Sequence, residues 1–173
     1  MQIKEKIDIF RRALREFLAL PTLIILLFLF LAVSAYMFER SRLQLYSPLR
    51  DFLETRIFAD AQATSQLLGT IAGSIITVTS ITITLMLLIL QQTATTLSTQ
   101  VFDQFLRRRS NQIYFGFFIG LALYTLITLA TVDEPFNPIF SAALAFLLTV
   151  VALYLLIVLF YSTINQMRPP VII

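Results

Sequence analysis

The sequence contains no cysteine, no histidine and no tryptophan. Without cysteine the chain can form neither a disulfide nor a thiolate nucleophile, and without histidine it has no imidazole for acid–base catalysis or metal binding. Charge is also scarce, because 13% of the residues are charged, whereas about a quarter is usual in a soluble domain. These absences exclude chemistry that needs cysteine or histidine, and they disfavour a soluble globular domain.

Apolar residues make up most of the chain: 58% are hydrophobic, 16 are phenylalanine, and the mean hydropathy is +0.83. The charged residues leave four long uncharged windows, each longer than the roughly 20 residues that a spanning helix needs. We therefore predict an all-α polytopic membrane protein, folded as a single membrane domain over residues 1–173. The predicted transmembrane helices cover residues 20–38, 67–90, 113–132 and 139–161.

Two amphipathic segments flank the first span. In residues 1–18, apolar side chains recur at three- and four-residue spacings with basic residues between them, which predicts a helix lying on the membrane surface. Pro21 is expected in the first turn of the span that follows. Ser47-Pro48 resembles a helix start, so residues 48–60 are predicted to form an interfacial helix on the outer side.

The 13 lysines and arginines predict the orientation. If the chain crosses the membrane four times, most of these basic residues lie on the side that also carries both termini. By the positive-inside rule that side is cytoplasmic. In a bacterium this means the inner membrane. That side carries Lys4, Lys6, Arg11, Arg12, Arg15, Arg107, Arg108, Arg109 and Arg168, and the other carries Arg40, Arg42, Arg50 and Arg56.

All four glycines fall in two GxxxG pairs, Gly69 with Gly73 and Gly116 with Gly120. Glycines four residues apart leave a flat strip that lets another helix approach closely. The topology places the first pair in the outer leaflet and the second near the cytoplasmic face, so each needs its own partner. At either pair a leucine should disrupt packing, and Gly120→Ala is expected to be mild.

Each pair has a predicted partner. For the first we expect the small residues of the fourth span, either within one subunit or between copies. For the second we expect the lower end of the second span, around Thr95, Ser98 and Thr99. The predicted packing residues are Gly69, Gly73, Thr77, Ser80, Thr84, Gly116 and Gly120, with Ser141, Ala145, Thr149 and Ala152 on the fourth span.

The segment Gln91–Gln100 is rich in threonine and glutamine and carries no charge. An apolar stripe continues through it, so one interpretation is a cytoplasmic extension of the second span packed against neighbours. A second is a polar face that lines a water-filled path in an oligomer, through Thr84, Gln91 and Thr95. A third is disorder. The sequence leaves all three open.

Reactive constellations are not found. No Asp, Glu, Lys or Arg lies within the four predicted spans, which disfavours a proton relay, and Asp133-Glu134 sits in a proline-rich turn. We expect no enzymatic activity, no cofactor and no metal. Basic residues beside apolar spans indicate contact with lipid headgroups rather than with nucleic acid. The predicted headgroup residues are Arg11, Arg12, Arg107, Arg108 and Arg109.

Residues 67–78, with the block Ala72-Gly73-Ser74, resemble a widespread bacterial family of predicted membrane proteins of unknown function, domain-of-unknown-function family twenty-two fifty-four. The similarity covers roughly residues 60–173. Further matching residues are Gln112, Gly116, Phe118, Gly120, Tyr124, Phe136, Asn137, Pro138, Ile164 and Gln166.

The resemblance implies a soluble cytoplasmic region after the fourth span, so this chain is either a piece of a longer protein or a short form. Where family members tend to carry a histidine pair, this chain has Tyr161 and Ser162.

The predicted function is assembly or anchoring in the membrane, as a homo-oligomer or as a subunit of a larger membrane complex. The alternative is an oligomeric channel or transport component lined by the second span. The lipid bilayer is the expected partner in either case.

Overall fold

The computed structural model describes residues 2–41, 53, 58, 60–96, 109–133 and 136–167. Side chains are described at these positions except 2–17, 86, 89–96, 110 and 163–167. Within this part the secondary structure is helical, apart from one isolated bridge. The helices are α1 (Gln2–Arg40), α3 (Ala61–Thr96), α5 (Arg109–Ala130) and α6 (Ile139–Met167). An all-helical architecture is thereby confirmed.

Each helix contains a segment long and apolar enough to cross a membrane, which confirms the predicted number of spans for the described residues. The second apolar segment begins at Ala61, earlier than the predicted residue 67, because α3 begins there. The predicted interfacial helix at 48–60 lies outside the described residues, apart from Leu53, Phe58 and Asp60. The apolar segments are Leu18–Arg40, Ala61–Leu85, Asn111–Ala130 and Ile139–Ser162.

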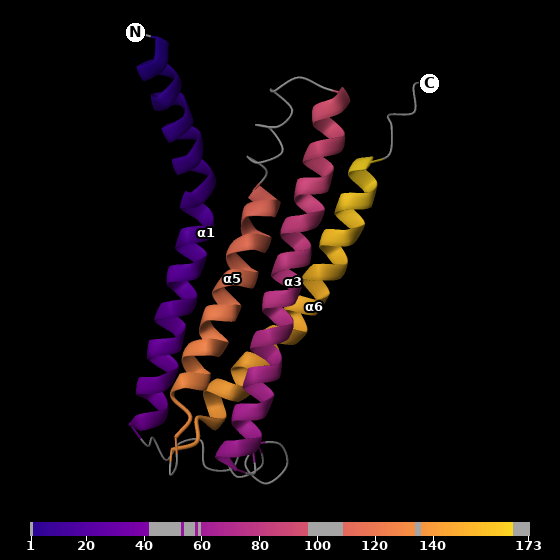
Figure 1. Ribbon diagram of the computed structural model, residues 1–173. Coiled ribbons are helices and arrows are strands. Elements are labelled where there is room, and N and C mark those ends of the chain that lie inside the picture. Colours follow the sequence, from indigo (N-terminus) through magenta and orange to yellow (C-terminus); the bar gives the residue numbers. More distant parts are fainter. Residues whose placement is uncertain are drawn as a thin grey trace.

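α1 differs from the sequence prediction. It runs without interruption through 39 residues, about 58 Å, where a surface helix and a separate span were expected. Pro21 lies inside this helix rather than in a first turn. Proline there removes one backbone hydrogen bond and its ring crowds the carbonyl four residues earlier, a disturbance that membrane helices tolerate because neighbouring helices and local adjustments satisfy the freed group. The N-terminal end of α1 leans away from the other helices (Figure 1).

α5 is the central helix. It packs most extensively on α1, then on α3 and α6, and half of its apolar segment is buried, against 17% for that of α6. Its 22 residues span about 33 Å, close to the roughly 30 Å of a hydrocarbon core. Phe118, Leu121 and Tyr124 of α5 are fully buried.

The helices alternate in direction, so the start of α1 and the end of α6 lie at the same end of the bundle (Figure 1). The turn between α5 and α6 is tight, with an isolated antiparallel bridge between Asp133 and Phe136. Phe58, from the connection between α1 and α3, is buried, and its carbonyl accepts a hydrogen bond from the Asn137 side chain, 3.3 Å. The start of α1 and the end of α6 therefore lie at the same end of the bundle (Figure 1), and the cytoplasmic location of both termini stays a prediction.

Candidate helix-association site on α3

The two GxxxG pairs have opposite environments. Gly116 and Gly120 are buried. A methyl group added at Gly116 would lie 2.9 Å from Cα of Pro21 and 3.0 Å from Cβ of Ile24, and one added at Gly120 would lie 2.5 Å from Cδ2 of Phe28. α1 and α5 therefore approach each other closely because these two positions have no side chain.

This placement corrects the predicted partner of the second pair. We expected the lower end of the second span, but the nearest atoms belong to α1. The backbone of Thr95 lies in α3, but its side chain is not described. Ser98 and Thr99 lie outside the described residues. α1 and α5 run in the same direction. Pro21 and Ile24 of α1 therefore lie against Gly116, and Phe28, one turn further along α1, lies against Gly120.

Gly69 and Gly73 are bare by comparison. Both are exposed, and no described atom outside their own helix surroundings lies within 4 Å of a methyl group placed at either one. Thr77, Ser80 and Thr84 share this helical register and are also exposed. We call these five residues the α3 stripe. It faces away from the other described helices.

The fourth span does not cover the α3 stripe within one chain. Its own small residues point into the protein: Ser141, Ala145 and Ala152 are buried and Thr149 is half-buried. The Ser141 hydroxyl donates to Glu39 of α1, and its carbonyl accepts from Tyr124 of α5. The structure therefore lacks the contact within one subunit, and these buried residues of α6 are not accessible to the α3 stripe of another copy either.

The hydroxyl groups of the α3 stripe are satisfied by their own helix. Thr77 donates to the Gly73 carbonyl at 2.9 Å, Ser80 to the Ile76 carbonyl at 3.0 Å, and Thr84 to the Ser80 carbonyl at 2.9 Å. Such bonds, four residues back along the helix, leave no donor that needs an outside partner. The α3 stripe also carries no charge, so another helix can cover it without burying a polar donor that lacks a hydrogen-bond partner.

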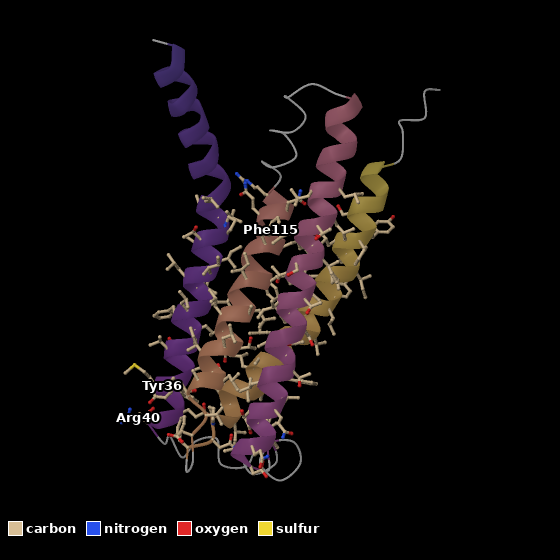
Figure 2. The ribbon with its side chains drawn as sticks, in the orientation of Figure 1. Tyr36, Arg40 and Phe115 are labelled. Carbon is tan, nitrogen blue, oxygen red and sulfur yellow. The ribbon has the colours of Figure 1, made fainter. Side chains whose placement is uncertain are left out.

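Isoleucines border the α3 stripe in the helical register, with Ile76 and Ile83 on one side and Ile81 on the other, all exposed. A glycine floor with larger residues beside it is typical of close helix pairs in membranes. The outward faces of the other long helices look different, since they expose large apolar side chains such as Phe30 and Ile157, at 75% and 67%. Those faces suit lipid, and Figure 2 shows their side chains extending from α1 and α6.

The remaining predicted residues are only partly described. Arg109 is exposed at the start of α5. Arg107 and Arg108 lie outside the described residues, as do the side chains of Arg11, Arg12 and Gln91. The described residues hold no group of three or more His, Cys, Asp or Glu side chains that could bind a metal.

Residues 15–173 match a family model described as predicted membrane protein (DUF2254). The chain belongs to this family. The match extends further toward the N-terminus than the similarity noted in the sequence, and it includes the first span and Pro21. No curated protein and no solved structure matches the chain.

Two residues that matter for packing were missed in the sequence. Phe28 fills the space over Gly120, and its ring packs edge-on against Phe117, with centroids 5.3 Å apart. Glu39 reaches the start of α6. For Phe28 a signal existed, because it lies seven residues after Pro21 and so on the same helix face. In a run of leucine and phenylalanine that signal does not stand out.

Proposed function

We propose that this chain is an integral membrane assembly module that associates through the α3 stripe, either with further copies of itself or with another membrane subunit. The observation that carries the proposal is the bare glycine pair Gly69 and Gly73 on an outward helix face. In lipid, helices associate through close packing rather than through the hydrophobic effect. A glycine face left open to lipid gives up the dispersion contacts that a second helix would supply.

The other outward faces support the same choice. α1 and α6 present bulky apolar side chains that pack well with acyl chains, whereas the α3 stripe presents glycine and hydroxyl groups. Its hydroxyls need no water, because each one donates to its own helix. The proposal involves no enzymatic step. It places the chain in the bacterial inner membrane with both termini in the cytoplasm.

The test is the mass of the assembly in nanodiscs, measured by native mass spectrometry. We expect wild type to carry more than one copy or a co-purified subunit, and Gly73→Leu to be monomeric, because the leucine holds the partner helix away. Ala19→Leu, at an exposed position on α1, is the matched control and should assemble like wild type. A strictly monomeric wild type without a partner contradicts the proposal, and so does a Gly73→Leu variant that assembles normally.

A second candidate is an oligomeric channel or transport component lined by α3. The observation that favours it is that Gln62 and Gln66, near the start of α3, are exposed along with Thr84, and uncharged polar residues suit a water-filled path. Ion flux from liposomes reconstituted with the assembled protein tests this candidate. Flux that changes in Thr84, Gln91 or Thr95 variants supports it, and silence in wild type and variants counts against it.

A further inference from the structure

The first turn of α6 has an unusual cap. The first helical hydrogen bond runs from the Ala142 amide to the Pro138 carbonyl, 2.9 Å, so Pro138 occupies the N-cap position. Proline has no side-chain oxygen, and a helix start normally needs one to accept the free amide hydrogens. The preceding residue does not substitute, because the side-chain nitrogen of Asn137 donates to the Phe58 carbonyl and its Oδ1 accepts no hydrogen bond from the described residues.

Glu39 supplies the missing acceptor from another helix. One carboxylate oxygen of Glu39 accepts the Phe140 amide at 2.7 Å, and the other accepts the Ser141 hydroxyl at 2.8 Å. Glu39 precedes Phe140 by 101 residues and lies in the last turn of α1. A carboxylate at a helix N-terminus gains from charge-assisted hydrogen bonds and from the helix dipole.

The contacts around Glu39 join three helices. The Phe38 and Phe140 rings lie 5.3 Å apart, and the Tyr36 and Phe136 rings 5.7 Å apart. Tyr124 of α5 donates its hydroxyl to the Ser141 carbonyl at 3.0 Å. Figure 2 shows Tyr36 and Arg40 at this end of α1. We call the contact of Tyr36, Phe38 and Glu39 with Phe136, Phe140 and Ser141 the α1–α6 junction.

We propose that Glu39 caps α6 from a different helix of the same chain, so that the first turn of α6 is stable only while α1 is docked against it. α1 and α6 share less contact than the pairs α1–α5, α3–α5, α5–α6 and α3–α6, and the α1–α6 junction is part of that small contact, so we take it as the link that couples the two helices. When α1 moves away at this end, α6 loses its cap, and when α1 docks, both helices are fixed together. The inference is independent of association through α3.

The absence of cysteine from the chain allows a direct test. The double variant Phe38→Cys/Phe140→Cys, in nanodiscs with a copper–phenanthroline oxidant, reports on the α1–α6 junction by its rate of disulfide formation. Added to this background, Glu39→Ala is expected to slow cross-linking roughly tenfold. Glu39→Gln keeps one acceptor and the side-chain volume, so it should slow the reaction less. It also provides a result if the alanine variant does not fold.

A second substitution, which restores a cap to α6 without restoring the contact with α1, separates the effect of the cap from the coupling of the two helices. Pro138→Ser places an acceptor at the N-cap of α6 itself. In the Glu39→Ala background it should restore amide hydrogen-exchange protection at Phe140 without restoring the cross-linking rate. If Pro138→Ser restores both, the cap does not act through α1 and the proposal is wrong. It is also wrong if both Glu39 variants cross-link and exchange like wild type.

Asp60 provides a matched control, since it caps α3 locally: the Ala63 amide donates to its side chain at 2.5 Å. Asp60→Ala should lower exchange protection at Ala63 and leave the rate at the α1–α6 junction unchanged. A rate that falls as far as in Glu39→Ala would show that loss of any cap loosens the bundle, which overturns a specific role for Glu39.

Discussion

The GxxxG motif occurs twice in this molecule, once packed against another helix and once on an exposed helix face. At Gly116 and Gly120 the absent side chains let α1 approach so closely that a methyl group would overlap Pro21 or Phe28. At Gly69 and Gly73 a methyl group would meet no described atom outside the local helix within 4 Å. One pair is part of the fold of a single chain, and the other is left over once that fold is complete.

The difference shows what a GxxxG pair encodes. Two glycines four residues apart specify a helix face that allows close approach, but they do not specify which helix arrives. The partner depends on the arrangement of all the helices. Because α5 lies at the centre, its glycine face finds α1, whereas α3 uses its other side for the core through Leu68, Ile71 and Ile75. The α3 stripe lies on the part of that helix that does not pack against the described core.

The largest effect is expected from bulk at the buried pair. Gly120→Leu should prevent α1 from packing on α5, and Gly120→Ala should cost about 1–3 kcal/mol, because its methyl group would lie 2.5 Å from a Phe28 ring atom. Phe28 is itself held by Phe117 and Tyr124, so it cannot move freely. This corrects the expectation that alanine at Gly120 is mild. Unfolding in detergent, followed by circular dichroism, measures the loss.

The bare pair provides the control for this effect. Gly73→Ala and Gly73→Leu should leave the unfolding free energy of the detergent-solubilised monomer close to that of wild type or slightly higher, since glycine is a poor helix former. Equal losses at Gly73 and Gly120 would erase the distinction between the two pairs. So would a Gly120→Ala variant as stable as wild type.

A smaller loss is expected from the hydrogen bond that joins α5 to α6. Tyr124→Phe removes the donor to the Ser141 carbonyl, 3.0 Å away in a buried site, and should lower the unfolding free energy by about 1 kcal/mol. Tyr161→Phe, at a position 74% exposed on α6, should have no measurable effect. If both variants unfold like wild type, the bond at Tyr124 contributes nothing to the contact between α5 and α6.

The sequence predicted the helices better than their contacts. Long uncharged windows around Phe28, Ile75, Phe118 and Ala145 were enough to locate four spans, because membrane helices are specified by length and apolarity alone. Helical spacing also identified which residues share a face. It could not assign neighbours, since Gly116 meets Pro21 only through the packing of the whole bundle.

The cap of α6 could not be predicted from the sequence. Glu39 and Phe140 are 101 residues apart, and sequence rules for helix caps concern residues within one turn. A proline at the N-cap shows that a local acceptor is lacking, but not where another one comes from. The continuity of α1 through Pro21 was hidden for a different reason, because proline usually marks a helix end whereas membrane helices tolerate it in their interior.

The smallest expected effect concerns the hydroxyls of the α3 stripe. Thr77→Val keeps the shape of the side chain and removes a donor that is used only by the Gly73 carbonyl, so the monomer should unfold like wild type. Association through α3 should hardly change, because Thr77 donates within its own helix; a hydrogen bond between membrane helices would contribute about 0.6 kcal/mol on average. Association measured by energy transfer between labelled copies in liposomes checks this. A much larger loss would show that Thr77 donates to the partner in the assembly, and the α3 stripe would then act through polar contacts rather than through glycine packing.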